Sequence, residues 1–298
     1  MAALITSDFV LPSEVADGIW KKAQTESTIA RLSGAEPQKF GQTNVMVLTA
    51  APKAELVGES VQKSPTPTTY GNKTVNPLKL QVTMRVSNEV MWADEDYQLG
   101  ILNDMRNNAG IALGRALDLV GYHKINPLTG TVSAAVTEGV TDTQNTSTLA
   151  NGKYDQAVEA AAGLIIADGY TPNGIAMDPT LSFGLGTQRN ADEIKLYPEI
   201  GFGTDVSAFL GMKAAVSDTV SGKQEIPSAS ATNIIGIVGQ FDAIRWGIQR
   251  DIRAHLIEFG DPDGLGDLQR LNQVAIRAEI VYGIGIMDLN AFAKVLTA

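Results

Sequence analysis

The longest run of regularly spaced hydrophobic positions in the chain lies in Ser87–His123. Apolar residues recur there at intervals of three and four, after an acidic cluster at Asp94–Asp96 that is typical of a helix N-terminus. The pattern predicts a helix over Asp96–Val120, about 37 Å long at 1.5 Å per residue, with Gly121 as its C-terminal stop. The predicted apolar stripe contains Leu99, Leu102, Met105, Ala109, Ala112, Leu113, Ala116, Leu117 and Val120.

Two strands are predicted before this helix. Apolar and polar residues alternate over Leu78–Val86, and Asn44–Ala50 is also strand-like, so we expect the two to pair as a hairpin. The segment between them has four prolines and few large apolar residues. It cannot bury a core of its own and should project from the molecule, where another subunit could cover it.

Helix and short-strand patterns alternate after the long helix. Helices are predicted at Lys153–Ala167 and from Asp178 onward, and short strands at Gly174–Met177, Lys213–Val216 and Ile234–Val238. This alternation predicts an α/β module inserted into the first domain. The remainder, 242–298, is mostly strand and should form a long antiparallel pair that returns to the long helix. The fold class is therefore α+β.

Composition limits the function classes. The chain has 298 residues, enough for about two domains, and no apolar run of about 18 residues that would indicate a membrane span. There is no cysteine and no signal-peptide pattern at the start, so a cytoplasmic origin is expected. The formal net charge of −10 has the wrong sign for a protein that binds nucleic acid through a broad basic surface.

The residues offer no constellation for catalysis or for a cofactor. The G-x-G pairs lack the third glycine of a dinucleotide site, and neither a P-loop nor a G-x-S-x-G motif is present. His123 and His255, the only histidines, are far apart and without carboxylates at metal-ligand spacing. Asp261, Asp263 and Asp267 could hold a cation, but Leu265 breaks the spacing of a calcium-binding loop and favours a solvated turn.

Several motifs, in order, carry a family resemblance. After an arm and first helix in LPSEVADGIWKKAQTESTIARL come RVSNEVMWADEDYQ before the long helix and ALDLVGYHKINPLTG at its end. GMKAAVSDTV, then IIGIVGQFDAIRWGIQRDI with Gln240 where an aspartate is usual, and VAIRAEIVYGIGIMDLNAFAKV follow. Together they resemble the major capsid proteins of tailed phages, whose shell fold is named after the Hong Kong lambdoid phage and is shared with encapsulins.

The resemblance implies a division of the chain. Residues 1–32 would be the N-terminal arm and short helix, and 49–77 an extended loop that lies over an adjacent subunit. Residues 33–48, 78–149 and 242–282 would form a peripheral domain that contains the long helix, known in the family as the spine helix. Residues 150–241 would form an axial domain, to which 283–298 returns. Candidate contacts between subunits are Lys53, Lys63, Lys73, Arg245, Arg250, Arg253 and Arg277.

The implied function is self-assembly into hexamers and pentamers that close as an icosahedral shell around double-stranded DNA. The implied location is the virion, after assembly in the host cytoplasm. A portal is the implied further partner, and scaffolding or decoration proteins are candidate partners. No cofactor and no membrane partner are expected. An encapsulin-type shell around protein cargo is the alternative with the same fold, and a soluble enzyme is a third hypothesis for which the sequence supplies no nucleophile or base.

Overall fold

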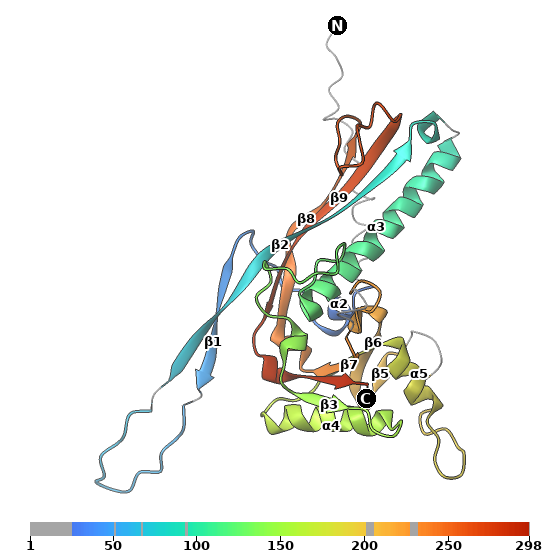
Figure 1. Cartoon of the computed structure of the whole chain (residues 1–298). Coiled ribbons are helices and arrows are strands. Elements are labelled where there is room, and N and C mark those ends of the chain that lie inside the picture. Colours follow the sequence, from blue (N-terminus) through green and yellow to red (C-terminus); the bar gives the residue numbers. More distant parts are fainter. Residues whose placement is uncertain are drawn as a thin grey trace.

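Figure 1 shows an elongated sheet flanked by one long helix, a hairpin that projects to one side, and a second layered unit at the base. The predicted arm and most of the segment predicted as the first helix lie outside the described residues. Within the last part of that segment, a short helix, α2 (Thr28–Leu32), begins after its N-cap Ser27. The computed structural model describes residues 26–50, 52–66, 68–92, 95–200, 206–226 and 232–297.

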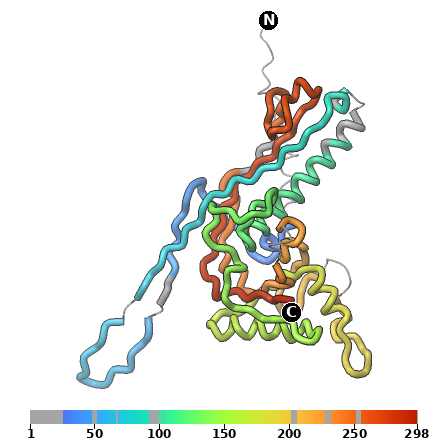
Figure 2. Tube along the Cα trace, in the orientation of Figure 1, coloured from blue at the N-terminus to red at the C-terminus, as the bar shows by residue number. Residues whose placement is uncertain are grey.

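The elongated sheet has four antiparallel strands from both ends of the chain. Their order is β1 (Thr43–Ala50), β2 (Thr69–Ser87), β9 (Gln273–Ile286) and β8 (Ile244–Ile257). Figure 2 shows the cyan strand β2 beside the orange and red C-terminal strands of this sheet. The predicted long antiparallel pair in the last part of the chain is confirmed as β8 and β9.

The long strand β2 changes partners halfway along its length. Its first part, Thr69–Val75, pairs with β1, and its second part, Asn76–Ser87, pairs with β9. The predicted pairing of Asn44–Ala50 with Leu78–Val86 is therefore wrong. β2 begins at Thr69, before the alternating pattern starts, and β1 pairs with the part of β2 that precedes Asn76.

The long helix is α3 (Glu95–His123), which packs along β2 and β9 (Figure 1). The buried hydrophobic residues described in this helix run from Ala109 to Tyr122, whereas Met105, predicted to lie within the buried stripe, is only partly buried. The helix also passes Gly121, where an added Cβ would lie 2.6 Å from Ile29 Cδ1, so this glycine permits close packing and is not a stop. No helix in the described part of the chain is long and apolar enough to cross a membrane.

The second unit is a six-stranded mixed sheet with two helices. The predicted helices are present as α4 (Tyr154–Ala167) and α5 (Pro179–Thr187), and Asp178 caps the second as expected. The predicted short strands are also present. One further strand of this sheet, β3, comes from the segment that precedes residue 150. The strand order is β3 (Thr146–Thr148), β10 (Phe292–Leu296), β7 (Ile234–Gly239), β4 (Gly174–Met177), β6 (Met212–Val216) and β5 (Ala208–Phe209).

Two main hydrophobic clusters hold these layers together. One joins α2, α3 and the four-stranded sheet and extends to the second sheet, where Phe241 and Phe292 meet edge to face at 5.7 Å. The other lies between the six-stranded sheet and helices α4 and α5. Short 3₁₀ turns connect the parts: η2 (Val90–Trp92), η3 (Val140–Asp142), η4 (Asp218–Val220), η6 (Phe241–Ala243) and η7 (Leu289–Ala291).

Candidate assembly surfaces

The loop that joins β1 to β2 is held together by its own hydrogen bonds. Thr66 Oγ1 donates to the carbonyl oxygen of Lys53 at 3.1 Å, and Ser64 donates to the carboxylate of Glu55 from its amide at 3.0 Å and its hydroxyl at 3.2 Å. Figure 1 shows this loop at the far end of the projecting hairpin. These hydrogen bonds link the two arms of the loop, which is called the finger below.

The tip of this finger exposes apolar side chains. Leu56 is fully exposed, at 102%, and Val61 is 60% exposed, with the exposed acid Glu59 between them. Exposure of two such residues on a segment without a core favours a partner that covers them. In the rest of the article, the hairpin tip means Glu55–Val61.

The three candidate lysines have different surroundings. Lys53 and Lys63 are exposed. Lys73 lies on β2 and binds Glu138 within the same chain, with its Nζ 2.6 and 2.9 Å from the two carboxylate oxygens. This ion pair borders a cavity of about 290 Å³ between the base of the hairpin and residues 135–138.

The candidate arginines of β8 also differ. Arg245 contacts Glu36 at 3.1 Å, in the segment that follows α2. Arg250 is exposed and lines a groove on the sheet. The side chain of Arg253 lies outside the described part of the chain, and its backbone pairs with Glu279 of β9.

Two arginines hold the loop between β8 and β9. Arg277 donates to Thr83 Oγ1 at 3.0 Å and to the carbonyl oxygen of Pro262 at 2.6 Å. Arg85, which the sequence did not single out, contacts Asp263 through Nε at 2.8 Å and Asp261 through Nη2 at 3.1 Å. The hydrogen bonds to Asp263 raise the pKa of Arg85, and Arg85 in turn lowers the pKa of the Asp263 carboxyl.

The Arg85 guanidinium lies where a cation bound by these acids would have to sit. Asp267, the third acid of that hypothesis, instead accepts a hydrogen bond from the backbone amide of Arg270 at 3.0 Å. Within the described residues, no group of three or more potential metal ligands comes together. The acids of this loop are bound internally, which is consistent with the predicted turn.

A buried carboxylate joins three segments that are distant in sequence. Asp118 of α3 accepts backbone hydrogen bonds from Thr28 at 2.8 Å and Ile29 at 3.1 Å, at the start of α2. Its oxygens also accept from the hydroxyls of Ser27 at 2.6 Å, Thr28 at 2.8 Å and Thr219 at 2.8 Å. Burial raises the pKa of Asp118, and these hydrogen bonds to the carboxylate act in the opposite direction.

Two more side chains of α3 bind the segment around η4. Arg115 contacts Asp218 at 2.5 Å and also pairs with Glu225. The ring Nε2 of His123 lies 3.2 Å from the carbonyl oxygen of Thr219 and 3.0 Å from that of Val220, and burial lowers the pKa of this histidine. The Ser-Asp motif seen in the sequence therefore connects the second sheet to the long helix.

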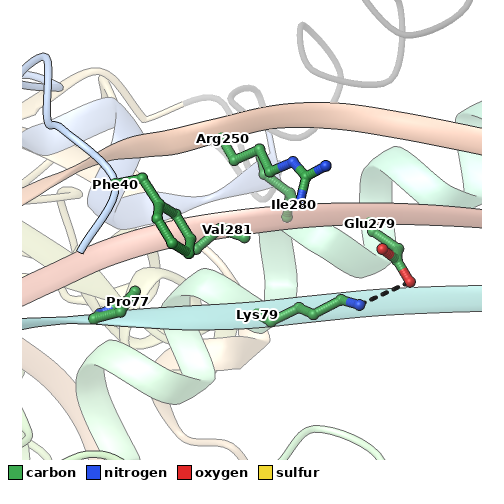
Figure 3. Close-up of a pocket in the computed structure, with 7 residues that line it drawn as sticks. All are labelled: Phe40, Pro77, Lys79, Arg250, Glu279, Ile280 and Val281. Atoms are coloured by element: carbon green, nitrogen blue, oxygen red, sulfur yellow. Dashed lines mark ion pairs between the residues drawn. The ribbon is translucent and has the colours of Figure 1, made fainter. Parts of the chain in front are cut away.

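A groove of about 240 Å³ crosses the four-stranded sheet near the base of the hairpin. Figure 3 shows the Phe40 ring beside Val281 and an ion pair of 3.0 Å between Lys79 and Glu279 at the other end. Phe40 is 70% exposed, so an aromatic edge and two cationic side chains face solvent together. The groove is lined by Phe40, Pro77, Lys79, Arg250, Glu279, Ile280 and Val281.

Comparison with known proteins identifies the family. The model of the phage capsid family matches residues 7–296, nearly the whole chain. A comparison with curated proteins finds no match.

Two solved structures from phages share both sequence and fold with this chain, and a third solved structure shares the fold. A structure from Mycobacterium phage Ogopogo is 52% identical, covers 94% of each chain and superposes with a TM-score of 0.84. A structure from Gordonia phage Cozz is 31% identical over 92% of this chain and 87% of that one, with a TM-score of 0.77. The capsid of a native GTA particle, 14% identical over 93% and 90% of the two chains, shares the fold at a TM-score of 0.62.

The family match covers both sheets, the projecting hairpin and the long helix. The identity of 52% to a structure from a mycobacteriophage extends over the same length and is far above the level at which only the fold is shared. The mixed α/β architecture predicted from the sequence agrees with these structures. This chain belongs to the phage capsid family and is a major capsid protein of a tailed bacteriophage.

Proposed function

We propose that copies of this chain assemble as hexamers and pentamers into an icosahedral shell that encloses double-stranded DNA without sequence-specific binding. The observation that supports this most directly is the projecting hairpin. Its tip exposes Leu56 and Val61 and carries no core of its own, and an isolated two-stranded ribbon is only marginally stable in water. A neighbouring subunit that covers the hairpin would bury its exposed apolar side chains and so stabilise it.

The proposal assigns a role to each part of the chain. The extended loop, 49–77, lies over the adjacent subunit, and the second sheet with α4 and α5 surrounds the fivefold and sixfold positions. The four-stranded sheet and α3 form the outer part of each ring. The proposed division is arm 1–32, peripheral domain 33–48 with 78–149 and 242–282, and axial domain 150–241 with 283–298.

The candidate contact residues divide into two proposed roles. Lys53, Lys63 and Arg250 are exposed and can contact a neighbour directly. Lys73 and Arg277 are bound within the chain, so they would act by holding the hairpin base and the β8–β9 loop in the shape that the neighbour meets. Arg245 and Arg253 remain proposed contacts on β8.

The proposed partner beyond the chain itself is a portal protein, with scaffolding or decoration proteins as candidates and assembly in the host cytoplasm. The role is structural and not enzymatic. The encapsulin alternative shares the fold but is not better supported, because the structures at 52% and 31% identity come from phages.

Electron microscopy of the purified protein tests the proposal. We expect closed particles built from rings of five and six subunits, together with free rings. Particles from infected cells should contain double-stranded DNA, whereas protein cargo would support the encapsulin alternative. A protein that sediments as a monomer at high concentration under all assembly conditions would refute the proposal.

A further inference from the structure

The groove beside Phe40 has the character of a binding site for a peptide. Strand alternation directs Pro77, Lys79, Glu279 and Val281 to one face of the sheet, opposite the residues that pack against α3. Val281 is buried at the floor, with only 7% exposed. An apolar floor with polar groups at its rim is typical of ligand sites.

The groove also carries positive charge that is not fully neutralised. Lys79 is paired with Glu279 at 3.0 Å. Arg250 is exposed, and within the described residues no ion pair or hydrogen bond of its side chain is found. The groove therefore suits an occupant with an apolar side chain and a carboxylate.

The hairpin tip has this complementary chemistry. Leu56 and Val61 are exposed apolar side chains, and Glu59 is an exposed acid between them. We propose that the tip of one copy docks in the Phe40 groove of the next, with Leu56 against Phe40 and Val281 and Glu59 beside Arg250. This inference rests on the proposed function, and it names the surface that receives the loop.

The contact must join different copies. Phe40 precedes β1 and the tip follows it, so a strand of eight residues, about 26 Å long, separates the two within one chain. The tip and the groove are different surfaces of the subunit. Such a contact is head-to-tail and closes into a ring when the rotation between neighbours allows it.

Cross-linking in the assembled protein tests this contact, because the chain has no cysteine. The variant Leu56→Cys/Phe40→Cys is assembled and treated with a short bismaleimide. We expect a ladder of covalent multimers that ends at the ring size. The matched control is Leu56→Cys/Leu265→Cys, whose second site is 71% exposed in the β8–β9 loop. The control should give about tenfold less multimer, since only apposed sites reach millimolar effective concentration.

A charge exchange provides a second measurement. Arg250→Glu should slow assembly about tenfold at low salt, because a charge at the rim of a contact mainly affects association. The double variant Arg250→Glu/Glu59→Arg should restore the rate. Arg270→Glu, an exposed arginine elsewhere in the chain, serves as the control and should have little effect.

The outcomes separate the two proposals. Docking in the groove would be refuted if shells form normally but the Phe40→Cys and Leu265→Cys double variants give equal amounts of multimer. It would also be refuted if the single variant Leu56→Cys gives the same products as the Phe40→Cys double variant. Either result leaves the proposed function intact. Failure of the charge exchange to restore assembly would count against the Glu59–Arg250 contact. A chain that stays monomeric in every variant would refute the proposed function and this contact with it.

Discussion

Asp118 connects the start of α2 to α3 and to η4. Two of its partners are backbone amides, Thr28 N on Oδ2 and Ile29 N on Oδ1, and these donors cannot turn away. Each of the two oxygens is therefore required as an acceptor. Among the described residues no cation pairs with this buried carboxylate, which is tolerated because five hydrogen bonds replace its hydration.

Asp118→Asn tests this role with almost no change in shape. The side-chain amide must replace one oxygen by an NH₂ group, which then faces either the Thr28 or the Ile29 amide. We expect a loss of about 1–3 kcal/mol in the free energy of unfolding of the isolated subunit, measured by urea denaturation. Asp104→Asn, on the exposed face of the same helix, is the control. Equal unfolding midpoints for both variants would contradict the assignment.

His123 should make the subunit sensitive to acid. Burial lowers its pKa below the value of about 6.5 in the unfolded chain. Below that pH the unfolded chain takes up a proton that the folded chain does not. The stability contributed by the neutral His123 side chain is thus fully present above pH about 6.5, and the free energy of unfolding decreases as the pH falls below this value.

The acid effect is measured as a difference between proteins. His123→Gln should remove part of the loss of stability between neutral and mildly acidic pH, and His255→Gln, at an exposed position, should not. Subtracting the pH profile of the variant from that of the wild type cancels the contribution of Asp118 to the free energy of unfolding. That contribution has the opposite sign because the pKa of Asp118 is raised. Parallel pH profiles for wild type and His123→Gln would rule this prediction out.

At the scale of elements, the two halves of α3 should contribute unequally to stability. Leu113 is 1% exposed within the main cluster, whereas Met105 is only partly buried. In addition to the sheet, α2 and η4 contact the second half of the helix, at Asp118 and Arg115. We expect Leu113→Ala to cost about 2–5 kcal/mol and Met105→Ala clearly less. Thermal unfolding of isolated subunits measures both, and a reversed order would show that the burial differs in solution.

The hairpin should be stabilised by neighbours and not by its own chain. In the described part of the chain no second layer covers it outside its base, so its amides should exchange quickly in isolated subunits. In assembled particles, residues 52–66 and β1 should exchange slowly. Hydrogen exchange with mass spectrometry compares the two states, with β7 in the buried sheet as the internal control. Equal protection of the hairpin in both states would argue against a contact between subunits.

At the scale of the whole molecule, charge determines how the shell can retain DNA. With a net charge of −10 per chain, many copies cannot attract a polyanion through a broad basic lining. We expect shells to assemble without nucleic acid and to show negligible affinity for duplex DNA at physiological salt, measured by titration of purified subunits and shells. Tight binding that weakens steeply with salt would mean that a DNA-binding surface has been missed.

Much of the architecture could be predicted, because local patterns determine local elements. The alternation in Leu78–Val86 and the helical spacing before Leu117 both produced the expected elements. The pair β8 and β9 was predicted, but the residues of β2 that pair with β1 were not, since this pairing depends on where β2 begins and not on its alternation. The roles of Arg85 and Arg277 were also hidden, because an arginine that binds its own chain looks in sequence like one that binds a neighbour. Asp118 gave no signal beyond its position in a family motif.

The change of partners along β2 has a mechanical consequence. One continuous strand runs from the hairpin into twelve registered residue pairs with β9. When a neighbour pulls on the hairpin along its axis, the force acts parallel to β2 and loads the hydrogen bonds between β2 and β9 together, in shear. They do not open one after another, as they would if the strand were peeled away. The load then reaches the far end of the sheet, where Arg85 anchors the β8–β9 loop. Tension applied at the finger is thereby spread through the body of the subunit.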